Sequence, residues 1–228
     1  VTRRNLASLL AAAPPIFDFG PADTWTLLHS CAFDFSVWET FAPLATGARL
    51  VIVPTAIARA PADLAQLIDG EHVTVLNQTP SAFYHLAAVP ELIGRSLRYV
   101  IFGGEALEPR RLAGWFARFG DALPQLVNMY GITETTVHVT YWNVTAADAA
   151  SDASPIGRPL RGWQVYLADP EGRLVPRGCS GEIWVGGAGV ARGYLDRDDL
   201  TRDRFRDDRF RPGDGRRRVR HRGGGVFP

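Results

Sequence analysis

The sequence contains no lysine, and all 25 of its basic residues are arginine. A reaction that requires a lysine ammonium group therefore cannot be completed by these 228 residues alone. The rest of the chain is net acidic once the arginines that cluster near its C-terminus are set aside: Arg216, Arg217, Arg218, Arg220 and Arg222. This basic tail has no interleaved aromatic residues on which bases could stack, which argues against nucleic-acid binding.

Cysteine and long apolar runs are also scarce. Cys31 and Cys179 are too few, and too far apart, to indicate a disulfide framework or a zinc site. No apolar run approaches the roughly 20 residues that a membrane-spanning helix needs. The first ten residues lack the pattern of a secretory signal. We therefore expect a cytoplasmic location and no membrane partner.

Short apolar runs alternate with helical patterns through most of the chain. Residues 50–53, 73–76, 97–102 and 126–128 have the apolar character of buried strands, and the segments between them have helical spacing. Apolar strands separated by helices of about 10 residues are typical of a parallel sheet covered on both faces. We therefore predict an α/β fold, with a partial domain over residues 1–145.

Three polar clusters follow successive strands of this predicted sheet. They comprise residues 77–79, residues 103–105 and the stretch 128–136. Each alone is compatible with a simple turn. In parallel sheets, however, ligands bind beyond the carboxyl ends of the strands, where these clusters are expected to meet. Their coincidence predicts a ligand site.

The pattern changes after about residue 146. Residues 146–154 are small and acidic and indicate a loop, and residues 155–195 alternate between strand and turn patterns. We predict that residues 146–205 form part of a small β-barrel-like subdomain. The Arg-rich tail, residues 206–228, has little apolar content beyond Pro212 and is predicted to be disordered, weakly docked or aberrant.

Four motifs in order carry a family resemblance: FDFSVWE (33–39), GGEAL (103–107), NMYGITETT (128–136) and GEIWVGGAGVARGYL (181–195). With them the chain resembles the adenylation domain of nonribosomal peptide synthetases, within the AMP-binding superfamily that also holds acyl-CoA synthetases and luciferases. The resemblance implies a fragment of the large N-terminal domain of adenylate-forming enzymes. It also implies that an amino acid and ATP give an aminoacyl adenylate and pyrophosphate.

The resemblance assigns nucleotide contacts by motif position. Tyr130 would stack on adenine, Thr133 would contact the α-phosphate, and Glu134 would hold Mg²⁺ through a carboxylate oxygen. Thr133 and Glu134 are therefore the expected catalytic residues. The remaining expected ATP contacts border the adenine ring: Gly103, Gly104, Glu105 and Asn128.

The resemblance also assigns an amino-acid pocket, in which Asp34 would pair with the substrate's α-ammonium group. The full set resembles the threonine-activating pattern and comprises Asp34, Phe35, Trp38, Asn77, Ile101, Gly103, Met129, Val137 and His138. Asn77 and His138 could bond a side-chain hydroxyl, whereas apolar neighbours surround a methyl group. A site of that kind penalises valine, and serine is the harder competitor.

Two of these residues have simpler interpretations. Asp34 could be the N-cap of the helix that begins near Ser36, although Ser36 is itself a better N-cap. A single histidine in a Thr/Val-rich strand is more often structural, so the role of His138 depends mainly on the resemblance.

The chain departs from the family pattern at both ends. The phosphate loop that ends in lysine would precede Val1, and the lid domain with its catalytic lysine is missing. The Tyr/Arg-Thr-Gly-Asp motif should follow Phe210, where Asp214 lacks the preceding threonine and is not assigned. We expect an internal fragment that forms no detectable aminoacyl adenylate by itself.

The resemblance implies the partners of the parent enzyme. These would be L-threonine, a peptidyl carrier domain that bears the phosphopantetheine thiol, and a condensation domain. One alternative is a carboxylic-acid:CoA ligase, against which Asp34 and the ARGYL motif argue. The other is a non-catalytic remnant that still binds ATP or a partner.

Overall fold

The computed structural model describes residues 1–90, 94–208, 210 and 217–226. The chain forms two compact units. The α/β unit consists of Pro14–Gly131 and Thr140–Arg158. The β unit consists of Val1–Ala13, Ile132–Val139 and the described part of 159–228. In the part of the chain that the structure describes, no helix has the length and apolar character needed to span a bilayer.

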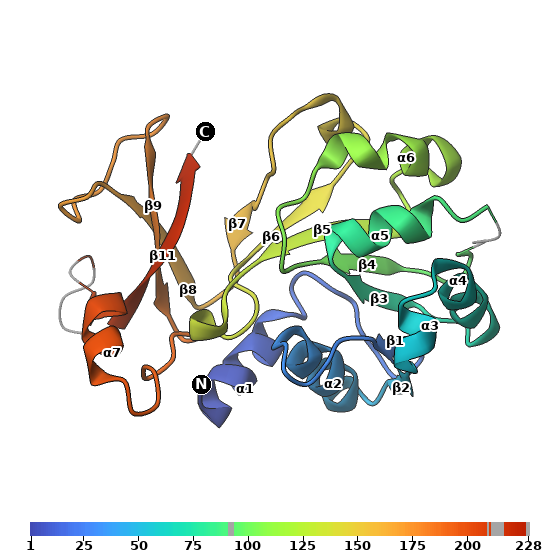
Figure 1. Ribbon diagram of the computed structural model, residues 1–228, viewed down its shortest axis with the longest axis horizontal. Coiled ribbons are helices and arrows are strands. Elements are labelled where there is room, and N and C mark those ends of the chain that lie inside the picture. Colours follow the sequence, from blue (N-terminus) through green and yellow to red (C-terminus); the bar gives the residue numbers. More distant parts are fainter. Residues whose placement is uncertain (91–93, 209, 211–216, 227–228) are drawn as a thin grey trace. The chain divides into compact units, whose positions relative to one another are not determined.

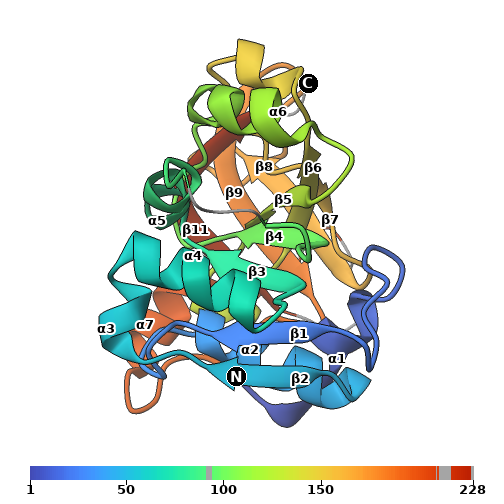
Figure 2. The ribbon, with the colours of Figure 1, turned by 90° about the vertical axis from the view of Figure 1, so that its right-hand side faces the viewer.

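The α/β unit is built on a mixed sheet with the strand order β2-β1-β3-β4-β5-β6-β7. Figure 2 follows this sheet from β2 at its lower edge. The strands from β1 to β5 pair in parallel, and β6 pairs antiparallel with β5. The strand bounds are β1 (Thr24–Leu27), β2 (Arg49–Ile52), β3 (Val75–Gln78), β4 (Tyr99–Phe102), β5 (Gln125–Tyr130), β6 (Thr140–Val144) and β7 (Arg158–Pro159).

Helices cover both faces of this sheet, as the sequence predicts (Figure 1). The helix bounds in the α/β unit are α2 (Phe35–Thr46), α3 (Thr55–Ala58), α4 (Pro61–Gly70), α5 (Pro80–Ala87), α6 (Ala113–Phe119) and the 3-10 turns Pro109–Leu112 and Asp148–Ala150. Ile68, Phe83 and Trp115 of α4, α5 and α6 share one core with Leu76 and Phe102 of the sheet. That face holds most of the apolar core.

The strands run further into the polar clusters than the sequence predicts. Asn77 lies within β3, where its register partner is Ile101, and Asn128 lies within β5, opposite Phe102. The expectation that Asn77 follows its strand is wrong, because β3 extends to Gln78, whereas Asn128 lies within a strand as the predicted strand 126–128 implies. Pairing on both sides satisfies the backbone groups of β3, β4 and β5, so polar residues can continue the strand.

The β unit contains a separate antiparallel sheet with the order β10-β11-β9-β8. Its elements are α1 (Arg3–Ala12), the 3-10 turn Thr133–Thr135, β8 (Trp163–Ala168), β9 (Ser180–Gly187), α7 (Asp198–Arg204), β10 (Phe205–Asp207) and β11 (Arg217–Val226). A parallel sheet with flanking helices followed by a β-rich part is therefore confirmed as the fold class.

The division between the units differs from the expected one at residue 145, because two segments far from the β strands in sequence belong with them. The Asn5 side chain donates to the carbonyl oxygens of Ala188 and Val190 at 2.7 and 3.2 Å. Within the segment 132–139, the Thr136 hydroxyl donates to the carbonyl of Gly189 at 2.7 Å. Nothing in the local sequence predicts these long-range hydrogen bonds.

The prediction of a disordered tail is wrong for residues 217–226, which form β11 and pair with β9 (Figure 1). Val219 is fully buried, and the Arg218 guanidinium lies 4.2 Å from the Trp184 ring centroid and 4.4 Å from that of Phe210. Because a guanidinium group can stack on aromatic rings, the buried Arg218 can stabilise β11 even though the composition of this strand is polar. Residues 209, 211–216 and 227–228 lie outside the described residues.

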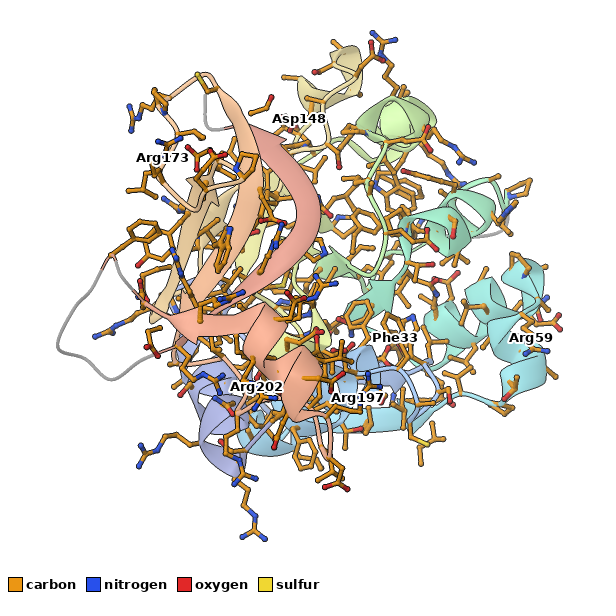
Figure 3. All side chains as sticks on the ribbon, turned by 60° about the vertical axis from the view of Figure 1, so that its left-hand side comes forward. Phe33, Arg59, Asp148, Arg173, Arg197 and Arg202 are labelled. Atoms are coloured by element: carbon orange, nitrogen blue, oxygen red, sulfur yellow. The ribbon has the colours of Figure 1, made fainter. Side chains whose placement is uncertain are left out.

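Arg218→Ala is expected to lower the free energy of unfolding by about 2 kcal/mol, because it removes two desolvated cation–π contacts. The matched control is Arg202→Ala on α7, where the side chain is exposed (Figure 3), and we expect a change within about 0.5 kcal/mol. Urea unfolding followed by circular dichroism measures both. Equal effects of the two substitutions would contradict the structural role of Arg218.

Candidate functional site

The predicted pocket residues of β3, β4 and β5 point to the face of the sheet opposite α4, α5 and α6. Asn77 of β3 pairs with Ile101 of β4, and Ile101 pairs with Val127 of β5. Met129 lies two residues after Val127 on the same strand. Because side chains alternate along a strand, these three share one face. All three are buried, and so is Trp38 of α2. The structure thus brings four predicted pocket residues to one side of the sheet.

A side-chain hydrogen bond joins two of these residues. Trp38 Nε1 donates to Asn77 Oδ1 at 3.1 Å, and both side chains are almost inaccessible to solvent. This bond uses the amide oxygen of Asn77 as its acceptor. The amide nitrogen, Nδ2, has no hydrogen-bond partner among the described residues. A buried donor without a partner costs about 1–3 kcal/mol, which a bound acceptor would offset.

The loop from β1 to α2 holds Asp34 between two phenylalanines. Asp34 is half-buried and occupies the N-cap position of α2, but its side chain makes no capping hydrogen bond. Ser36 lies inside the first turn and donates its hydroxyl to the carbonyl of Phe33 at 2.8 Å. The expectation that Ser36 is the N-cap is therefore wrong, because α2 begins one residue earlier.

The loop after β4 approaches this segment closely. Gly104 has φ +84°, and a Cβ atom at this position would lie 2.9 Å from Phe33 Cζ. A side chain here would therefore be strained and would also collide with the phenyl ring. Phe33 itself is partly exposed. Gly103, which precedes this turn, is buried.

Glu105 connects the same loop to the start of α5. Its carboxylate accepts hydrogen bonds from the backbone N–H of Ser81 at 3.1 Å and from the Ser81 hydroxyl at 2.9 Å. A carboxylate is favourable near the positive end of a helix. The family resemblance implies a place beside adenine for Glu105 but no role for Ser81, because nothing local in the sequence connects residues 24 positions apart.

Asn128 and Tyr130 lie on β5. Asn128 is buried, and its amide nitrogen donates to the carbonyl of Pro155 at 2.8 Å. Burial raises the pKa of Tyr130, so its phenol stays protonated at neutral pH. A neutral, partly buried aromatic ring is a suitable platform for a planar base.

The segment Ile132–Val139 carries four other predicted residues in the β unit: Thr133, Glu134, Val137 and His138. Thr136 and Val137 have φ angles of 65° and 64°, which are unfavourable for β-branched residues. Trp163 Nε1 donates to the carbonyl of Thr135 at 3.2 Å and so helps to hold the segment. Backbone strain of this kind is concentrated at functional sites in proteins.

His138 is buried, and desolvation lowers its pKa to about 3. The imidazole is therefore uncharged at neutral pH. A neutral ring can exchange hydrogen bonds with an uncharged hydroxyl without the cost of burying a charge.

Glu134 is held by groups that sequence reasoning did not identify. The Tyr194 hydroxyl donates to Glu134 Oε1, and the backbone N–H of Ala191 donates to the Glu134 carbonyl at 2.8 Å. Tyr194 belongs to the quoted GEIWVGGAGVARGYL motif, but its residue type alone assigns it no partner. Desolvation, the hydrogen bond to Glu134 and the charge of Glu134 raise the pKa of Tyr194 to about 12.

Glu134 fits the expected Mg²⁺ ligand chemically. Among the described residues there is no group of three or more His, Cys, Asp and Glu side chains that could hold a metal. Mg²⁺ usually takes one or two carboxylates together with phosphate oxygens and water, so one glutamate suffices. An ionised carboxylate has about four lone-pair sites, and one hydroxyl donor leaves others for a metal.

Gly104→Ala is expected to lower the free energy of unfolding by about 1–2 kcal/mol, because alanine is strained at positive φ and its methyl would displace Phe33. The control is Gly114→Ala on α6, where the added methyl has open space. That substitution should raise stability by about 0.5–1 kcal/mol through helix propensity. Chemical denaturation measures both, and a neutral Gly104→Ala would contradict the close packing.

Tyr194→Phe is expected to lower the free energy of unfolding by about 1 kcal/mol near neutral pH, through loss of the bond to Glu134. In the folded protein the pKa of Tyr194 is raised from 10.0 to about 12. The stabilisation by the Tyr194 hydroxyl is therefore fully present below pH 10.0 and is lost as the pH rises to about 12. The difference between wild type and variant should therefore shrink across that range. Tyr141→Phe is the control, because the Tyr141 hydroxyl accepts a hydrogen bond from Arg158, whereas the Tyr194 hydroxyl donates one to a carboxylate. A Tyr194→Phe difference that is constant with pH would contradict the prediction.

Comparisons with known proteins cover nearly the whole chain. Residues 1–195 match the family model described as AMP-binding enzyme. Malpinin synthetase of Mortierella alpina is 51% identical over 212 residues, which are 92% of this chain and 3% of that protein. A dimodular nonribosomal peptide synthase of Bacillus subtilis (strain 168) is 50% identical over 218 residues, which are 93% of this chain and 9% of that protein.

A solved structure agrees with these relatives. A four-domain holo nonribosomal peptide synthetase bound to AMP and glycine superposes with a TM-score of 0.86 and 28% identity, over 98% of this chain and 16% of that one. The present chain therefore spans a small part of the proteins it matches. From the family match and these similarities, the chain belongs to the family of AMP-binding enzymes.

Proposed function

We propose that this chain is a segment of an amino-acid-activating adenylation domain of a nonribosomal peptide synthetase, and that its substrate is L-threonine. The reaction joins the amino-acid carboxylate to the α-phosphorus of ATP and releases pyrophosphate. The acyl group then passes to the phosphopantetheine thiol of a carrier domain. The buried Trp38–Asn77 hydrogen bond, with its unused amide donor, is the observation that carries the choice of substrate.

The nucleotide is proposed to bind at the carboxyl ends of β4 and β5. There Gly104 removes side-chain bulk from a turn, and Tyr130 offers a neutral aromatic face. Gly103, Glu105 and Asn128 are proposed to border the adenine ring, with Glu105 keeping its loop against the start of α5. The similarity to a synthetase structure that holds AMP supports a nucleotide as the ligand.

Thr133 and Glu134 are proposed to act on the phosphates. Thr133 is exposed and would donate its hydroxyl to an α-phosphate oxygen. Glu134 would hold Mg²⁺, which neutralises phosphate charge when it is bound. The chain's own contribution is orientation, because Tyr194 fixes one carboxylate oxygen of Glu134 before any ligand arrives.

Asp34 is proposed to pair with the α-ammonium group of the amino acid. Its half-buried carboxylate is not used to cap α2, and it adjoins buried Phe35 and the buried Trp38. A partly desolvated carboxylate gains more from a cationic partner than an exposed one does. A carboxylic acid without an amino group would offer this carboxylate no positive charge.

The proposed threonine side chain meets both a donor and apolar surface. Asn77 Nδ2 would donate to the hydroxyl. His138 is retained as a proposed substrate contact on the resemblance alone, and its neutral ring suits an uncharged group. Valine would leave the Asn77 donor unpaired. The methyl group would contact the buried apolar residues that the α/β unit supplies, namely Phe35, Trp38, Ile101 and Met129. Val137 is retained as a proposed contact on the resemblance alone.

The partners follow from the kind of protein that the chain matches. Its relatives are named as peptide synthetases and synthases, and the chain spans 3% and 9% of the two described above. We propose that a peptidyl carrier domain receives the threonyl group and that a condensation domain uses it. These partners belong to the whole synthetase.

The proposal is tested with threonyl-, valyl- and seryl-sulfamoyl adenosine, which are stable mimics of the aminoacyl adenylates. Isothermal titration calorimetry on the full chain should give a dissociation constant for the threonyl compound at least about tenfold lower than for the valyl compound. Asn77→Leu should abolish that difference, because it removes the donor. The control Asn143→Leu, at an exposed position of β6, should keep it.

Other results would favour other functions. Binding of ATP without any preference among the aminoacyl compounds would favour a non-catalytic nucleotide-binding remnant. Tighter binding of an acyl-sulfamoyl adenosine that lacks the amino group would favour a carboxylic-acid:CoA ligase. Tighter binding of the seryl compound would retain amino-acid activation and replace threonine by serine.

A further inference from the structure

Glu39 is a fully buried carboxylate on α2 to which the nucleotide and amino-acid contacts proposed above assign no role. Its Oε2 accepts hydrogen bonds from the backbone N–H groups of Leu28 at 3.3 Å and His29 at 3.1 Å. Its Oε1 lies 3.0 Å from His29 Nδ1. Burial of a charge is costly unless it is paired and hydrogen-bonded, so this arrangement fixes the end of β1 against α2.

The carboxylate also fixes the His29 ring. Glu39 Oε1 and His29 Nδ1 lie at hydrogen-bond distance, and the tautomer with the proton on Nδ1 would complete the set of donors around this carboxyl group. The imidazole is stacked on the Phe35 ring, with a centroid distance of 4.8 Å and an interplanar angle of 18°. It meets the Phe33 ring edge-on at 5.4 Å and 82°. One ring therefore contacts both residues that flank Asp34.

The backbone around Asp34 is closed by short-range hydrogen bonds. The N–H of Phe33 donates to the carbonyl of Ser30 at 2.9 Å, and the N–H of Ser36 donates to the carbonyl of Phe33 at 3.0 Å. On its other side, Phe33 fills the space that a side chain at position 104 would need. His29 contacts both phenyl rings that flank Asp34, so its ring adds a tertiary restraint on this turn.

We propose that Glu39 and His29 form a positioning pair that orients the Asp34 carboxylate toward the α-amino group of the substrate. The proposal assigns neither residue a contact with the substrate. The pair acts through Phe33 and Phe35, and it serves recognition of carboxylic acids that carry an α-ammonium group. The inference rests on the proposed function, in which Asp34 binds that group.

The test compares two ligands that differ only in the α-amino group. Threonyl-sulfamoyl adenosine and its analogue with hydrogen in place of the amino group are titrated into the full chain by calorimetry. The ratio of the two dissociation constants measures recognition of the amino group alone. A loss of general stability weakens both ligands equally and leaves this ratio unchanged.

Glu39→Gln keeps the side-chain volume but places an amide where the carboxylate receives three donors. We expect it to reduce the wild-type ratio about tenfold, which corresponds to about 1.4 kcal/mol. Glu71→Gln is the matched control, because Glu71 is an exposed partner of Arg49 in the same unit, and it should leave the ratio unchanged. Circular dichroism and thermal melts show whether each variant is folded at the titration temperature.

His29→Asn is the second variant and decides alone if Glu39→Gln does not fold. The asparagine amide nitrogen reproduces the Nδ1 donor, so Glu39 keeps a partner, but the ring that contacts Phe33 and Phe35 is gone. We expect the ratio to fall here as well. Folded variants with the wild-type ratio would overturn the positioning role.

The proposed function fails in a distinguishable way. If the wild-type chain does not prefer the amino-bearing ligand, amino-acid activation is overturned, and the inference with it. If wild type has the preference and Asp34→Ala abolishes it, but Glu39→Gln and His29→Asn retain it, only the positioning role is overturned.

Discussion

The in-register pairing of β3, β4 and β5 is the constraint on which the α/β unit depends. Asn77 is paired with Ile101, and Ile101 with Val127, so alternate residues of all three strands face the same way. This alignment gives one face to Leu76 and Phe102 in the apolar core and the other to the proposed pocket. A register slip of one residue would turn the pocket side chains toward the apolar core and the core side chains toward the pocket.

The loops after β1 and β4 support one another and the start of α5. Glu105 of the loop after β4 binds the start of α5, and Gly104 of the same loop lies under Phe33. Phe33 in turn contacts His29, which Glu39 holds from α2. Groups that are fixed before a ligand binds lose less entropy on binding, so mutual support of this kind favours recognition.

In the β unit, hydrogen bonds hold a segment of strained backbone. Its segment Ile132–Val139 contains two consecutive β-branched residues at positive φ, and hydrogen bonds from Trp163 and to Gly189 hold that strained backbone in place. The same unit supplies Tyr194, which donates to Glu134. Strain and a fixed carboxylate thus occur within a few residues of each other, where the proposed phosphate contacts also lie.

Residue types at fixed spacing were enough to predict the alternation of apolar strands and amphipathic helices, and hence the α/β class. The four ordered motifs likewise indicate the family from sequence alone. Which polar residues lie inside strands, as Asn77 and Asn128 do, was decided by pairing with neighbouring strands. Tertiary packing alone placed Arg218 against Trp184, because these residues lie on strands that are distant in sequence. Glu39 and His29 are close in sequence, but their contact depends on how α2 packs against the end of β1, which no local pattern specifies.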